Sequence, residues 1–256
     1  LASLVGISLG LIGSGGSILT VPILVYVMGV SPVLATAYSL FIVGSTALVG
    51  GFQNIYQKKV DFKTAIIFGI PSIAAVYATR LWLMPIIPKI LLHIGNFELT
   101  KNIGLMLLFA VFMVLASISM IRSGKKHEET THAEIRYNYP LILLEGIVVG
   151  ILTGLVGAGG GFLIIPALVL LARLPMQLAV GTSLFIIAAK SLFGFMGDLQ
   201  GDQTMDWHLL LTFTVASVVG IFVGNYLSRF FSGAKLKTAF GWFVLLMGIY
   251  IITKEI

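Results

Sequence analysis

Two glycine-rich segments with matching spacing are the residues of this sequence best suited to bind an anion. Each contains Gly-x-Gly-Gly followed six residues later by proline, from Gly13 to Pro22 and again from Gly157 to Pro166. Glycines clustered within an apolar run predict a break in a helix, because glycine adopts backbone angles that other residues resist. We expect a half-helix to begin after each break, near Ser17 and near Gly161. The first N–H groups and the positive dipole end of such a half-helix attract an anion.

Backbone N–H groups at both breaks are therefore the predicted anion ligands. A P-loop is excluded, since neither glycine run is followed by Lys-Ser or Lys-Thr. The alternative is that the glycines only allow apolar helices to pack closely. Two matched runs, each ahead of a proline, favour broken helices instead. The predicted ligand residues of the two breaks are Gly13, Ser14, Gly15, Gly16, Ser17, Gly157, Ala158, Gly159, Gly160 and Gly161.

Three polar residues inside apolar segments are further candidates for the anion site. Lys190 lies in the middle of segment 177–198, where an ammonium group is costly unless it pairs or faces water. It could attract the anion, or alternate between anion and proton. The alternative is that it snorkels or neutralises a nearby carboxylate. Ser39 and Ser183 occupy matching positions and could donate to an oxygen of the anion, or bond to their own helix backbone.

Polar residues at segment ends suggest an access path. Asn54 and Asp198 end equivalent segments. Both could line the path, and Asp198 could carry a proton, although ordinary interfacial positions would explain them equally well. Arg80, near the end of its segment, is expected to snorkel to the interface. His93 and His208 form no metal-binding pattern, and we expect neither a metal nor another cofactor.

Composition places these residues in a membrane. Of the 256 residues, 58% are hydrophobic and 10% are charged, whereas a soluble domain carries about a quarter charged residues. Apolar runs long enough to cross a bilayer, about 20 residues each, recur along the chain, so we expect an all-α integral membrane protein in contact with lipid. No basic stripe with interleaved aromatic residues suggests a nucleic-acid partner. The predicted apolar segments are 1–28, 33–56, 64–86, 102–121, 139–172, 177–198, 207–230 and 235–253.

The chain contains an internal repeat. An offset of 144 residues (154 − 10) aligns Gly10–Pro22 with Gly154–Pro166 without a gap, and also aligns Ser39-Leu-Phe-Ile42 with Ser183-Leu-Phe-Ile186. Glycines and a proline in fixed register are not explained by apolar composition alone, and internal repeats are a common plan among transporters. The predicted division is a first transmembrane repeat (1–121), a cytoplasmic loop (122–138) and a second transmembrane repeat (139–256).

Loop charge indicates that the two repeats are inverted. The loop near 57–63 is rich in lysine, whereas its counterpart near 198–206 has three aspartates and no basic residue. The positive-inside rule makes the first cytoplasmic and the second external. The basic loops 122–138 and 229–237 both join the cytoplasmic side if segment 139–172, longer than one span needs, enters and leaves by the same face. The predicted fold is two inverted repeats, each a broken (re-entrant) glycine-motif helix pair plus three transmembrane helices.

These motifs resemble those of a known family. The paired Gly-x-Gly-Gly…Pro sequences, the repeated Ser-Leu-Phe-Ile and the two-half layout are similar to the sulfite exporter TauE/SafE family of bacterial permeases. The resemblance covers essentially the whole chain and is specific in its two glycine motifs. It implies export, or less often uptake, of sulfite, sulfoacetate or related sulfur anions across the inner membrane.

The predicted function is a multi-pass secondary transporter of a small sulfur oxyanion, sulfite or an organosulfonate, in the cell inner membrane. The sequence contains no nucleotide-binding motif, so energy would come from an ion gradient, the substrate's own gradient or a separate subunit. A transporter or channel for another small anion is the alternative. An intramembrane enzyme is a third hypothesis, but it requires a nucleophile–base pair or a metal cluster, and the sequence indicates neither. The oligomeric state is left open.

Overall fold

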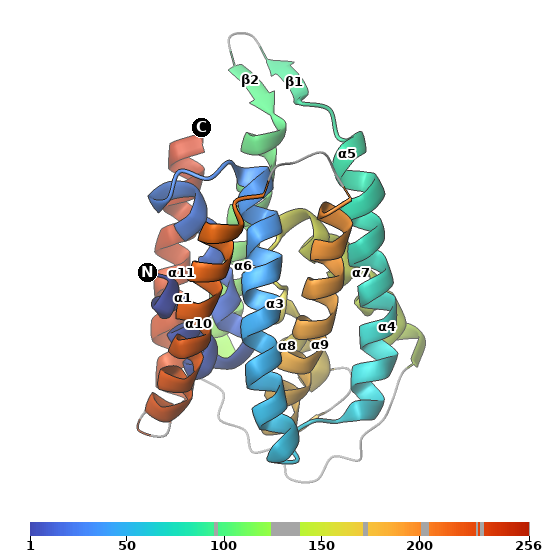
Figure 1. The fold of residues 1–256 in the computed structure, drawn as a ribbon, viewed down its shortest axis with the longest axis vertical. Helices are drawn as coiled ribbons and strands as arrows, with labels where there is room; N and C mark the ends of the chain where they lie inside the picture. The colour runs from blue at the N-terminus through green and yellow to red at the C-terminus, as the bar shows by residue number, and fades with distance from the viewer. Residues whose placement is uncertain are drawn as a thin grey trace.

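Six helices in the described part of the chain are long and apolar enough to cross a membrane, which confirms the predicted all-α integral membrane fold (Figure 1). The computed structural model describes residues 1–94, 97–123, 139–170, 174–200, 205–228, 230 and 233–255. The six spans are α3 (Pro32–Tyr56), α4 (Phe62–Ala78) with its continuations η3 (Thr79–Leu83) and α5 (Met84–Ile86), α6 (Lys101–Ser123), α9 (Met176–Asp198), α10 (Trp207–Leu227) and α11 (Gly233–Glu255).

Each glycine run interrupts a shorter apolar helix, as predicted. The first broken pair is α1 (Ala2–Ile12), η1 (Gly13–Leu19), α2 (Thr20–Pro22) and η2 (Ile23–Val27), and the second is α7 (Tyr139–Val156) and α8 (Gly161–Leu170). Both first helices end where a glycine takes a left-handed angle, Gly13 with φ 72° and Gly157 with φ 74°. The second half-helix begins at Gly161 as predicted. The first, an apolar helix over Gly16–Val27, begins near Ser17 as predicted, although its first part belongs to the 3₁₀ helix η1 and not to an α-helix.

A short β-hairpin joins α5 to α6. Its strands, β1 (Ile90–Ile94) and β2 (Phe97–Thr100), pair antiparallel, and the sequence analysis predicted no strand there. The helix ends at Ile86 because Ile87 precedes Pro88, and a residue before proline is pushed out of the helical region. The connection between α5 and α6 has fourteen residues, whereas five separate α10 from α11 in the second half.

Equivalent helices of the two halves run in opposite directions. In Figure 1, α3 runs downward and α9 upward, α4 upward and α10 downward, α6 downward and α11 upward. The ends of α3, α6 and α10, which lead into the basic loops, lie together at the bottom of the view. The end of α9, which leads into the acidic loop, lies at the top. Opposite directions are what inverted copies require.

Several contacts between the halves occur twice with the roles exchanged. Asp61 caps α4 and Asp206 caps α10, each accepting a hydrogen bond from a backbone N–H of its own helix. The backbone N–H of Asp61 donates to Thr182 Oγ1 at 2.9 Å, and that of Asp206 donates to Tyr38 Oη at 2.6 Å. Tyr38 and Thr182 are themselves equivalent at the offset of 144 residues (182 − 38). Reciprocal contacts of this kind accompany a two-fold relation.

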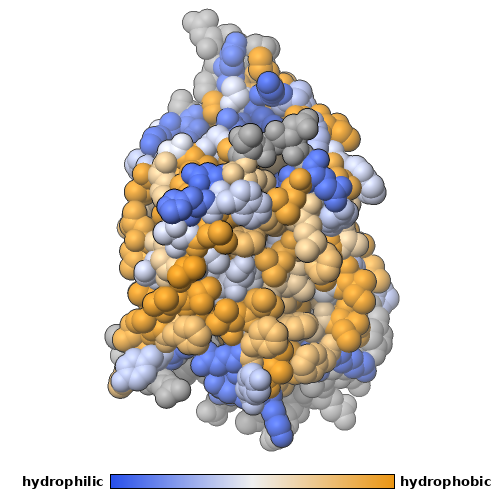
Figure 2. Space-filling view, viewed as in Figure 1, coloured by the Kyte–Doolittle hydropathy of each residue, from blue (hydrophilic) through white to orange (hydrophobic). Residues whose placement is uncertain are grey.

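The outer surface suits a lipid environment. Figure 2 shows hydrophobic side chains over much of the middle of the visible face, with hydrophilic side chains gathered toward its top and bottom. Large apolar side chains of α10, among them Leu211, Val215 and Phe222, are more than half exposed. Such exposure is unfavourable in water and favourable against hydrocarbon. The most buried of the six spans are α3 and α9, and the two broken pairs pack against them.

Candidate functional site

The two glycine breaks lie in contact inside the bundle. Ser17 of η1 donates from its Oγ to the carbonyl oxygen of Ala158 in the second break, at 2.5 Å. Both residues are buried, and a Cβ added to Gly159 would lie 3.4 Å from the Cβ of Ser17. The structure therefore brings together the two runs that the sequence analysis singled out.

The second break offers free backbone donors. α7 ends with a hydrogen bond donated by the N–H of Gly157, and α8 begins with bonds to the carbonyl oxygen of Gly160. Between these points the N–H groups of Ala158, Gly159 and Gly160 have no hydrogen-bond partner among the described residues. Successive N–H groups beside left-handed residues form an anion-binding concavity. The first break differs, because the i→i+3 bonds of its 3₁₀ helix use N–H groups there.

Helix α9 delivers a cation to this second break. Lys190 is completely buried, and its Nζ donates to Thr153 Oγ1 of α7 at 2.8 Å. A Cβ added to Gly160 would lie 2.7 Å from the same Nζ. No carboxylate among the described residues lies within ion-pair distance of Lys190. The snorkelling and carboxylate-neutralising alternatives therefore do not describe Lys190 here.

One face of α3 packs against the same break. A Cβ added to Gly157 would lie 2.5 Å from the carbonyl oxygen of Thr36, and one added to Gly159 would lie 2.7 Å from Val43 Cγ1. Ser39 shares this face, because residues three and seven apart on a helix point the same way. Its hydroxyl is buried without a partner among the described residues. An unsatisfied buried hydroxyl is unfavourable, so Ser39 is free to donate to a ligand.

The remaining predicted residues lie elsewhere or are already bonded. The Oγ of Ser183 donates to the carbonyl oxygen of Val180 in its own helix at 2.8 Å, which is the alternative left open above. Asn54 donates from Nδ2 to the carbonyl oxygen of Gly50 at 2.8 Å, near the end of α3. Asp198 ends α9, so these two residues sit at opposite ends of the bundle (Figure 1).

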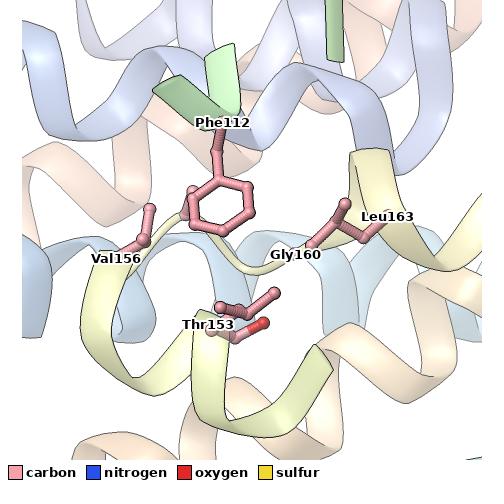
Figure 3. A pocket seen from close by; sticks show the side chains of 7 residues that line it. Phe112, Thr153, Val156, Gly160 and Leu163 are labelled. Atoms are coloured by element: carbon pink, nitrogen blue, oxygen red, sulfur yellow. The ribbon is translucent and has the colours of Figure 1, made fainter. Parts of the chain in front are cut away.

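A small cavity adjoins the cation and the free amides. It encloses about 10 Å³, room for about one water molecule, so an oxyanion enters only if the helices move apart. Figure 3 shows Phe112 of α6 pointing toward the bend between α7 and α8, opposite Thr153. The lining residues are Phe112, Leu152, Thr153, Val156, Ala158, Gly160 and Leu163.

Comparison with known proteins identifies the family. The model of one protein family, described as sulfite exporter TauE/SafE, matches residues 1–251. The chain belongs to the TauE/SafE family. It is therefore a multi-pass membrane transporter, and no solved structure gives a significant match to it.

Relatives in this family carry the same general description. The chain is 31% identical to a probable membrane transporter protein of Xylella fastidiosa (strain 9a5c), over 98% of this chain and 92% of the relative. It is 30% identical to the probable membrane transporter protein YunE of Bacillus subtilis (strain 168), over 85% of this chain and 81% of the relative. These relatives are transporters by name, and their names give no substrate.

One charged residue of this TauE/SafE member lies where the sequence analysis did not place it. Arg80 was expected to snorkel to the interface, and that expectation is wrong. Its side chain is buried and pairs with Asp198, Nη1 to Oδ2, at 3.3 Å. The reason is that Thr36 of α3 and Asp198 of α9 offer the guanidinium polar partners inside the bundle. The only sequence signal was an arginine six residues inside an apolar segment.

Proposed function

We propose that this TauE/SafE member is a secondary transporter that exports sulfite or an organosulfonate across the bacterial inner membrane. In this proposal the anion binds at midplane between the two glycine breaks and no catalytic step takes place. The observation that carries it is the buried ammonium of Lys190, which donates to a hydroxyl. No carboxylate among the described residues pairs with it, and beside it lie three backbone N–H groups that have no hydrogen-bond partner among those residues.

The argument from charge is direct. A buried ion without a counter-ion is strongly unfavourable, and proteins retain one where it has a function. An anion at the second break would neutralise Lys190 and accept hydrogen bonds from the free amides and from Ser39. A trioxy anion has enough acceptor oxygens to satisfy donors on several sides at once, which favours sulfite and sulfonates. The proposed ligands are Gly13, Ser14, Gly15, Gly16, Ser17, Ser39, Gly157, Ala158, Gly159, Gly160, Gly161, Ser183 and Lys190, with Asn54 and Asp198 on the access path.

The proposed architecture supplies a transport mechanism. We take residues 1–121 and 139–256 as inverted repeats related by an axis in the membrane plane, supported by the opposite helix directions and the reciprocal contacts of Asp61 and Asp206. The basic loops then face the cytoplasm. Rocking one half against the other would open the site to one side at a time, as in other inverted-repeat transporters.

A flux assay tests this function. Purified protein in liposomes is given sulfite, methanesulfonate, sulfoacetate, sulfate, nitrate and chloride, each on both sides for counterflow, with protein-free liposomes as the control. We expect saturable counterflow of sulfite or of a sulfonate, and faster flux for these than for nitrate or chloride. If another anion is transported and no sulfur oxyanion is, the proposed substrate is wrong and that other anion takes its place. Unsaturable flux without counterflow would indicate a channel.

A further inference from the structure

A buried guanidinium outside the two breaks has unused donors. Arg80 of η3 lies between α3 and α9, and its Nη1 donates to Thr36 Oγ1 at 3.1 Å and pairs with the carboxylate of Asp198 at 3.3 Å. Its Nε and Nη2 are buried and have no hydrogen-bond partner among the described residues. A guanidinium presents its N–H groups as a planar fork that matches two oxygens of one oxyanion. The unused side of Arg80 therefore has the chemistry of an oxyanion site.

The backbone around Arg80 permits this burial. Thr79–Leu83 form a single π-helical stretch within the long α4–α5 helix, and such stretches are frequent at functional sites. Gly197 of α9 faces the arginine, and a Cβ added there would lie 2.9 Å from the Cβ of Arg80. A larger residue at position 197 would displace Arg80 from its place beside α9.

The guanidinium lies between the second break and one end of the bundle. Thr36, which accepts from Arg80, also packs against Gly157 of the break. Asp198 follows Lys190 by eight residues on α9, which is about 12 Å at the helical rise of about 1.5 Å per residue. The Asp198 side chain is 14% exposed, so water reaches the ion pair from the end of α9.

We propose that Arg80 is a second oxyanion site, at the mouth opposite the basic loops. An anion passing between water and the break binds Nε and Nη2, the side of the guanidinium that Asp198 does not occupy, and competes with the Asp198 carboxylate for its positive charge. The inference rests on the proposed function, since it adds a step to the path of the same anion. Lys190 in the middle of α9 and Arg80 beside its end keep a dehydrated anion paired as it moves, which avoids the penalty of an uncompensated charge.

The equivalent position in the other half is neutral. Asn225 follows Arg80 by 145 residues, the offset that also separates the capping residues Asp61 and Asp206 (206 − 61). Its Nδ2 donates to Gln53 Oε1 at 2.5 Å, joining α10 to α3 near their lower ends in Figure 1. The two ends of the bundle thus carry related contacts between equivalent helices, the ion pair of Arg80 with Asp198 at one end and the amide pair of Asn225 with Gln53 at the other. The charged anion site is specific to one mouth.

Sulfite-dependent thermal stabilisation of the purified protein in detergent tests this site. We compare wild type with Arg80→Gln, Arg80→Lys and Asp198→Asn, and use Arg122→Gln as the control, because Arg122 is an exposed arginine near the end of α6. Arg80→Gln should weaken the apparent sulfite affinity about tenfold or more, the loss of a charge-assisted bond. Arg80→Lys should be intermediate, because it keeps the charge without the fork. Asp198→Asn should tighten affinity several-fold, and Arg122→Gln should leave it unchanged.

The opposite signs at the two partners separate a binding site from a structural ion pair. A purely structural pair predicts that both substitutions lower the unfolding temperature and that neither changes sulfite affinity. If Arg80→Gln does not fold, Asp198→Asn still decides, because weaker or unchanged sulfite affinity in that variant overturns the inference. If wild type responds to sulfite and Arg80→Gln responds equally, the inference about Arg80 is overturned but the proposed function is not. A wild type that responds to neither sulfite nor methanesulfonate overturns the proposed function with it.

Discussion

Adding one methyl group at Gly160 should weaken anion binding as well as the fold. Gly160 has φ 64°, an angle that costs a residue with a Cβ about 1–2 kcal/mol. The new Cβ would lie 2.3 Å from Thr153 Oγ1 and 2.7 Å from Lys190 Nζ, and overpacking of this kind costs about 1–3 kcal/mol. Gly160→Ala should therefore lower the free energy of unfolding by about 2–5 kcal/mol.

The same methyl group displaces the ammonium from the free amides. Loss of a hydrogen bond to a charged group costs about 1.5–3 kcal/mol, so the KM for sulfite in proteoliposomes should rise about tenfold or more. Gly69→Ala is the matched control, because a Cβ at Gly69 in α4 would meet nothing within 4 Å. That variant should unfold and transport like wild type. A folded Gly160→Ala protein with the wild-type KM would refute the placement of the anion at the second break.

Four further substitutions test the parts that support the site. Ser17→Ala removes the bond between the two breaks and should lower stability by about 0.5–1.5 kcal/mol, measured by thermal unfolding; no change would mean the breaks are held by packing alone. Asp61→Ala and Asp206→Ala each remove a helix cap and should each cost about 1 kcal/mol; strongly unequal losses would argue against equivalent halves. Gly197→Ala should displace Arg80 and weaken sulfite affinity like Arg80→Gln, and unchanged affinity would show that Arg80 tolerates the shift.

The sequence predicts the helix breaks because glycine is needed where the backbone turns left-handed. Gly13 and Gly157 fill that role in register, and each packs against the equivalent long helix, on Val180 and Thr36 respectively. The alignment of the two repeats does not predict the backbone conformation that follows each break. Ser17 lies in a 3₁₀ helix whereas its equivalent Gly161 starts an α-helix, a difference that depends on packing around each break.

Long-range partners are the part that the sequence could not supply. Lys190 is conspicuous as a charge inside an apolar segment, but its contact with Thr153 depends on how α9 packs against α7. Arg80 was misjudged because hydropathy does not reveal the π-helical stretch or the partner Asp198 on another helix. The β-hairpin was missed because residues 87–101 lie between two predicted segments, and Ile90–Ile94 lacks the alternation of apolar and polar residues that indicates a strand.

Substitution of Lys190 by methionine, followed by sulfite titration, tests the central claim most directly. Methionine keeps a similar length without the charge, and removing a buried charge that lacks a counter-ion is neutral or stabilising. Lys190→Met should therefore unfold at the wild-type temperature or above it, while sulfite, which raises the unfolding temperature of the wild type, no longer raises that of the variant. A variant that sulfite stabilises as much as wild type would contradict binding of the anion at Lys190.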